Sequence, residues 1–77
     1  MEMMSLSDTA AGDVVKVVEI DAGRGLKLRL EQLGLFPGSL IEVLSNNRGH
    51  VLIKAQGAVI SLSKGIASKV LVDKVQQ

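Results

Sequence analysis

Short apolar segments separated by turn residues constrain the fold of this 77-residue chain more than any other feature. The segments lie at residues 14–20, 40–44, 51–55, 58–62 and 70–75 and are rich in valine, isoleucine and leucine. Side chains branched at Cβ lose rotamer freedom in a helix and pack well on a pleated strand. Turn signals recurring about every 8–12 residues are typical of a small sandwich or barrel. The pattern therefore predicts an all-β domain of five short strands.

One helix is expected after the first strand. Leu26, Leu30 and Leu33 follow one another at spacings of four and three, which places them on one helical face. Gly34 stands where a helix ends in a residue of positive φ. A single helical turn is expected before the last strand, with Ser63 as its N-cap. The chain is thus predicted to hold one helix of about two turns and one shorter helical turn.

The connection after the helix is predicted to form a defined turn. Pro37 presets φ and Gly38 accepts a positive φ, the type II arrangement.

Five short strands hide their edges best by closing on themselves. We predict a single domain over residues 1–77, with its core at about 5–75, folded as a five-stranded SH3-like barrel. An OB-type barrel is the competing choice, although its helix usually lies between the third and fourth strands.

The composition weighs against most chemistry. Cysteine is absent, so disulfides, thiolate metal sites and catalytic thiols are excluded. The single histidine, His50, lies at an expected hairpin end, and it is only a weak candidate metal ligand. The acidic residues are scattered, and no nucleophile with a paired base is evident. We expect no cofactor and no enzymatic activity.

The expected location is the cytoplasm. The purely apolar runs are far shorter than the roughly 20 residues of a membrane-spanning helix. The first residues lack the basic and apolar regions of a signal peptide. Direct insertion into a membrane is therefore not expected.

Nucleic-acid binding is the main alternative from another functional class. The net charge is only +1, and Phe36 is the one aromatic residue, so a basic surface with stacking platforms is lacking. Two groups of cations remain available for such a role: Arg24, Lys27 and Arg29, and then Lys64, Lys69 and Lys74. A regulator that associates with nucleic acid stays open as the alternative function.

Residues 29–38, RLEQLGLFPG, resemble the R-L-x-x-L-G-x-x-P-G signature of the FeoA family. Leu6-Ser7-Asp8 followed by Gly12 is similar to the opening of that family, and the likeness extends over about residues 5–75. The resemblance implies an SH3-like barrel and an accessory role in ferrous iron uptake. The implied partner is a ferrous iron permease with a cytosolic GTP-binding domain, so the chain would work at the inner face of the membrane.

The resemblance also implies two other properties. The same module occurs fused to metal-dependent transcriptional repressors, which supports a regulator as the alternative. Transition-metal binding is a label of the family, and with one histidine and no cysteine this chain offers little to support it. Iron association would then be weak or shared between chains.

Protein contact is the function that remains after this elimination. A helix that lies on a barrel buries only one row of side chains against it. Some leucines of the expected helix should therefore stay exposed beside its cations, and an apolar patch with a charged rim is common at protein interfaces. Phe36 is expected to pack under the turn at the border of this surface. We predict a partner-binding surface formed by Arg24, Leu26, Lys27, Leu28, Arg29, Leu35 and Phe36. Burial of all the leucines in the core, and a barrel that self-associates through an apolar patch, are the alternatives.

Overall fold

The computed structural model describes residues 3–75 and has one antiparallel sheet of six strands with two α-helices. The elements follow in the order β1 (Met3–Ser5), the 3₁₀ turn η1 (Leu6–Asp8), β2 (Val14–Ile20), α1 (Arg24–Gln32), β3 (Leu40–Asn46), β4 (His50–Ala55), β5 (Ala58–Ser63), α2 (Lys64–Ala67) and β6 (Val70–Lys74). Every segment expected as a strand forms one, with ends that differ by two residues at most. The described residues contain no helix with the length and apolar character needed to span a bilayer.

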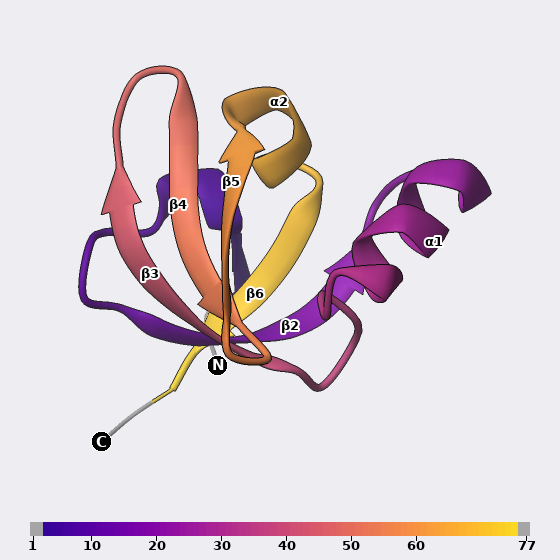
Figure 1. The fold of residues 1–77 in the computed structure, drawn as a ribbon, viewed down its shortest axis with the longest axis horizontal. Helices are drawn as coiled ribbons and strands as arrows, with labels where there is room; N and C mark the ends of the chain where they lie inside the picture. The colour runs from indigo at the N-terminus through magenta and orange to yellow at the C-terminus, as the bar shows by residue number, and fades with distance from the viewer. Residues whose placement is uncertain (1–2, 76–77) are drawn as a thin grey trace.

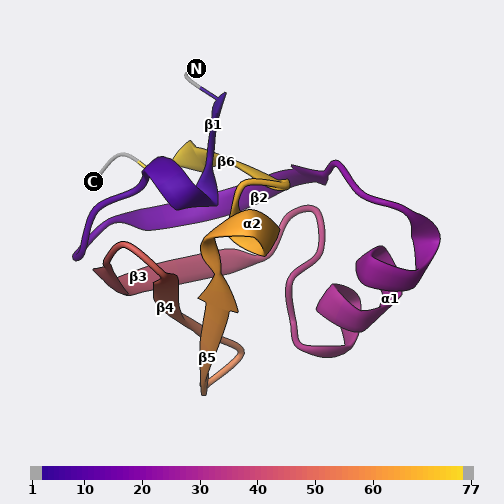
Figure 2. The ribbon, with the colours of Figure 1, turned by 90° about the horizontal axis from the view of Figure 1, so that it is seen from above.

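The sheet is strongly bent, so that its two halves face each other. Its strand order is β1-β6-β2-β3-β4-β5. Seen from above, β2 and β6 form one layer, β3, β4 and β5 form the other, and α2 closes one end (Figure 2). Helix α1 stands to one side of both layers (Figure 1). The mainly β, SH3-like fold is confirmed, but β1 and β5 do not pair with each other, so the predicted closed barrel is an open curled sheet.

The prediction of five strands missed β1. This strand pairs with β6 through Met3↔Asp73 to Ser5↔Leu71. Its three residues, Met-Met-Ser, contain no β-branched side chain, so the local sequence carries no strand signal. Pairing with a neighbour that is distant in sequence makes it a strand. The segment that follows is rich in polar and turn residues, yet it buries Leu6 completely in η1.

Bulges in two strands adjust which residues face the core. Val15, Val17 and Ile20 of β2 are buried, and the irregular register between Val17 and Glu19 turns both Val18 and Glu19 outward. A similar irregularity lies in β3 between Val43 and Ser45. The buried apolar residues are Leu6, Val15, Val17, Ile20, Leu30, Leu35, Ile41, Val43, Val51, Ile53, Ala55, Leu62, Ala67, Val70 and Val72.

The predicted caps and turns are confirmed. The Ser63 hydroxyl accepts a hydrogen bond from the Ile66 amide at 3.2 Å, at the start of α2. Gly38 has a φ of +96°, as the type II turn requires. Gly34 has a φ of +95° and follows the last residues of α1. These local signals could be found in the sequence because each depends on one or two residues with special backbone freedom.

Candidate partner-binding surface

Helix α1 ends in a Schellman motif that fixes the surface around it. The Gly34 amide donates to the Glu31 carbonyl at 3.0 Å, and the Leu35 amide donates to the Leu30 carbonyl at 2.9 Å. Leu30 and Leu35, the two residues that this motif brings together, are both buried in the core. Leu26 packs partly buried against the same core. The helix is therefore attached to the domain core by Leu26 and Leu30, which lie on the side of the helix that faces the core.

The remaining apolar residues of the segment face solvent. Leu28 is 53% exposed and Leu33 is 46% exposed. The alternative that all the leucines are core residues is therefore wrong. Leu33, which the sequence spacing places on one helical face with Leu26 and Leu30, is exposed while Leu30 is buried. Leu35 was predicted to contact a partner, but it is 0% exposed because the Schellman motif turns it inward. The structure thus removes Leu35 from the surface and adds Leu33.

The turn after α1 presents Phe36 outward. The Phe36 amide donates to the Ser39 hydroxyl oxygen at 3.2 Å, and this hydroxyl donates to the Phe36 carbonyl at 2.8 Å. Ser39, rather than Phe36, fills the buried position of the turn. The expectation that Phe36 packs under the turn is wrong, because its side chain is 38% exposed.

Three exposed cations lie on α1, and the first two share a hollow with Leu28: Arg24, Lys27 and Arg29. Within residues 3–75 the only ion pair joins Lys74 to Asp13 at 3.5 Å, so the cations of α1 form no ion pair with a described carboxylate. The first turn of the helix holds no acidic residue, and Gly23 provides no side-chain cap. Cations near the N-terminus of a helix lie close to the positive end of the helix dipole, which is unfavourable. This end of α1 can therefore interact favourably with a negatively charged group of a neighbour. Tertiary packing of Leu30, rather than local charge, keeps the helix formed.

Two hollows lie beside α1. One of about 450 Å³ is lined by Ala22, Arg24, Lys27, Leu28 and Glu31. The other, of about 590 Å³, separates the end of α1 from the β4–β5 hairpin, and we refer to it as the α1–β5 cleft. Its lining residues are Glu31, Gln32, Leu33, Gly34, Phe36, Ala55, Gln56, Ala58, Val59 and Ile60. The cleft thus joins apolar side chains of the helix end to those of an edge strand, a combination that no local sequence pattern could reveal.

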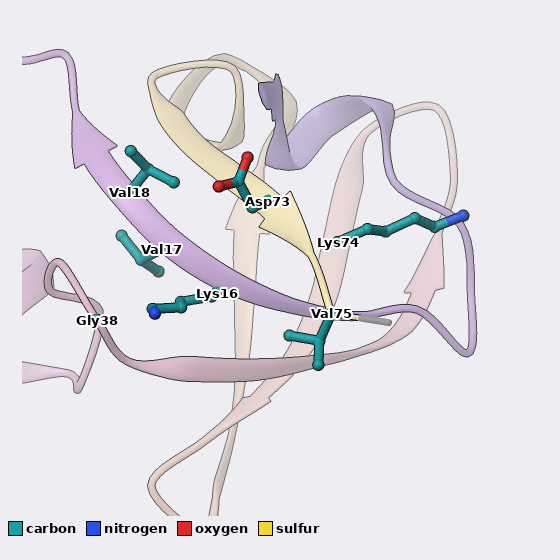
Figure 3. Close-up of a pocket in the computed structure, with 7 residues that line it drawn as sticks. All are labelled: Lys16, Val17, Val18, Gly38, Asp73, Lys74 and Val75. Carbon is teal, nitrogen blue, oxygen red and sulfur yellow. The ribbon is translucent and has the colours of Figure 1, made fainter. Parts of the chain in front are cut away.

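A further hollow of about 450 Å³ lies on the outer side of β2 and β6. Figure 3 shows Val18 and Lys16 on β2, with Asp73 opposite on β6 and the Lys74 amine directed away from them. Lys16 and Asp73 are direct cross-strand partners in the sheet. None of the residues predicted for partner binding lines this hollow.

Lys64 has a structural role that the sequence did not indicate. Its amine donates to the Ser7 carbonyl at 2.9 Å and to the Asn46 Oδ1 at 2.6 Å. The Asn46 Nδ2 donates in turn to the carbonyls of Ser7 and Thr9. This network ties η1 to the end of β3 and the start of α2, so Lys64 is not a free member of the second cationic group. Asn46 and Ser7 lie 18 and 57 residues away from Lys64 in sequence, so a local sequence pattern cannot predict these hydrogen bonds.

His50, the weak metal candidate, is exposed at the start of β4. In the part of the chain that the structure describes, no three residues among His, Cys, Asp and Glu gather closely enough to hold a metal ion. His50 is therefore not part of a cluster of three such ligands within the described residues.

Comparisons with known proteins relate this chain to a family. The model of the FeoA domain matches residues 4–74. A curated protein of Methanocaldococcus jannaschii, named "Putative Fe(2+) transport protein A", is 35% identical over 74 residues, which are 96% of this chain and 90% of that protein.

Solved structures agree with this assignment. A crystal structure described as "Iron Uptake Regulatory Protein (FeoA)" superposes with a TM-score of 0.91 at 32% identity, covering 96% of this chain and 100% of that one. A "Manganese-dependent transcriptional repressor complex with manganese" superposes with a TM-score of 0.87 at 22% identity, covering 97% of this chain and 38% of that one, and shares the fold alone. Because the family model spans nearly the whole described chain and the curated relative is 35% identical, this chain belongs to the FeoA domain family.

Proposed function

We propose that this chain is a non-enzymatic accessory protein of ferrous iron uptake, which acts in the cytoplasm by binding a ferrous iron permease that has a cytosolic GTP-binding domain. Membership of the family and the name of the curated relative support the connection to Fe(2+) transport. Docking would shift the populations of the permease's conformations, since a partner that prefers one state raises the share of that state.

The observation that carries the proposal is the exposed apolar surface of α1 and its turn. Leu28, Leu33 and Phe36 each leave more than a third of their surface in water. The cations Arg24 and Lys27 line one hollow with Leu28 and form no ion pair among the residues that the structure describes. An apolar centre with a charged rim is the usual anatomy of a protein interface. The cations favour an acidic area on the partner.

Replacing an exposed leucine on α1 tests the proposal. Leu28→Glu places a charge at the most exposed leucine of α1, and we expect the affinity for the permease in membrane vesicles to fall about tenfold or more. The matched control is Leu40→Glu on β3, because Leu40 is 58% exposed and lies outside the surface. Equal binding by folded Leu28→Glu protein would place the contact elsewhere.

Salt dependence separates this function from nucleic-acid binding. Binding to a nucleic acid releases counterions and weakens steeply between about 50 and 200 mM salt. Docking through apolar side chains weakens much less over this range, because burial of apolar area rather than charge supplies most of its energy. A steep loss of binding with salt, together with retention on nucleic acid, would favour the regulator instead.

A further inference from the structure

Strand β5 forms an open edge of the sheet. The hairpin that joins it to β4 has a two-residue turn of Gln56 and Gly57, flanked by the pair Ala55↔Ala58. Both turn residues have positive φ, at 51° and 78°, as in a type I′ turn. The pair flanking such a turn is hydrogen-bonded, and the pairs alternate from there along the ladder. The backbone N–H and C=O groups of Val59 and Ser61 therefore point away from β4.

No other strand in the described chain satisfies these groups. β5 pairs with β4 alone and ends the strand order. The side chains of Val59 and Ser61 are exposed as well, so water reaches this edge. Two amide donors and two carbonyl acceptors are thus presented in a row.

The edge also lacks the features that usually block strand addition. Proteins protect edge strands with charged side chains, proline, bulges or short length. β5 has six residues without a charge or a proline, and its register with β4 is unbroken from His50↔Ser63 to Ala55↔Ala58. The opposite edge, β1, is only three residues long. An unprotected edge strand can pair with an extended segment of another chain.

The surroundings of the edge restrict what can bind. The first residues of β5 line the α1–β5 cleft, whose far wall is the end of α1. In Figure 1, α1 stands beyond the free side of β5, where the body of a second folded copy would have to lie. A single extended chain is narrow enough for this position. Its apolar walls are Leu33, Phe36 and Val59, and Glu31 is the only charged residue that lines it.

We propose that the α1–β5 cleft binds an extended segment of the partner protein, which adds to the sheet as a strand beside β5. The added strand would form four backbone hydrogen bonds with Val59 and Ser61. The segment would carry apolar side chains at alternate positions, which pack against Leu33 and Phe36, and a basic residue that faces Glu31. This inference rests on the proposed function, because it takes the permease as the source of the segment.

A proline at the edge tests this binding mode. Ser61→Pro removes an N–H on the free edge of β5, next to the residues that line the cleft, and leaves the ladder with β4 intact, as edge strands allow. We expect binding to vesicles that contain the full-length permease to weaken at least tenfold. The matched control is Ala11→Pro in the loop before β2. Ala11 is exposed, and it lies neither in the α1–β5 cleft nor in α1. Circular dichroism and thermal unfolding show whether both variants are folded.

Hydrogen exchange of the wild-type chain provides a second measurement that needs no variant. In the free chain the amides of Val59 and Ser61 should exchange quickly, and in the complex with the permease their exchange should slow at least tenfold. Binding by the wild type without this protection, or equal binding by Ser61→Pro, overturns the strand-addition proposal and leaves the proposed function standing. Absence of binding by the wild type itself refutes both.

Discussion

The contact between Gly34 and the β4–β5 hairpin predicts a large and separable loss of stability. An alanine at position 34 would place its Cβ 2.6 Å from the Cγ and 3.3 Å from the Cβ of Gln56. Carbon atoms pack without strain at about 3.5–4.0 Å, so the Gln56 side chain must move, and its Cβ can move only together with the hairpin backbone. Such overpacking costs about 1–3 kcal/mol. The φ of +95° adds strain of about 1–2 kcal/mol for a residue that has a Cβ.

Gly34→Ala should therefore lower the free energy of unfolding by about 3 kcal/mol. A chain of this size has a total stability of about 4–12 kcal/mol. The melting temperature of a small domain falls by about 4–8 °C for each kcal/mol, so we expect a decrease of roughly 12–24 °C. Thermal and urea unfolding followed by circular dichroism measure it.

A double-mutant cycle separates the two causes. Gln56→Gly removes both atoms that the new methyl group would meet, so Gly34→Ala in that background should cost only the backbone strain. The expected coupling energy is about 1–3 kcal/mol, well above the roughly 0.5 kcal/mol scatter of independent sites. A coupling within that scatter would show that Gln56 does not restrict position 34.

Gly25→Ala is the matched control. Gly25 lies within α1, has an ordinary φ, and an added Cβ meets nothing within 4 Å. Alanine is a better helix former than glycine, so this variant should gain about 0.5–1 kcal/mol. Destabilisation by Gly25→Ala to the same degree as by Gly34→Ala would refute the reasoning from the Gly34 contact.

Two further predictions concern the polar network and His50. Asn46→Ala removes the donor to the Ser7 and Thr9 carbonyls and the acceptor of the Lys64 amine. We expect urea titrations to show a free energy of unfolding lower by about 1–3 kcal/mol. A change below about 0.5 kcal/mol would contradict the role given to this network. Calorimetry with Fe(II) should show no stoichiometric micromolar binding, because His50 belongs to no cluster of three metal-ligating side chains in residues 3–75. A one-to-one isotherm that His50→Ala abolishes would prove this wrong.

The local pattern of the sequence was sufficient to predict most elements of the fold. The β-branched segments became strands, and Gly34, Gly38 and Ser63 took the turn and cap positions expected of them. These predictions succeed because strand propensity, positive φ and capping depend on one residue and its immediate neighbours. The family signature in residues 29–38 combines such positions, which is why it could be found without a structure.

Only the tertiary structure decided which side chains form the candidate surface. Leucine spacing could not show that Leu35 turns inward while Leu33 and Phe36 turn outward, because a Schellman motif and the Ser39 hydroxyl determine it. Strand β1 and the Lys64 network depend on partners distant in sequence. The open edge of β5 follows from strand order, which hydrogen bonds between remote segments determine. The sequence thus determined the elements and the family, and long-range packing decided what the surface presents to a partner.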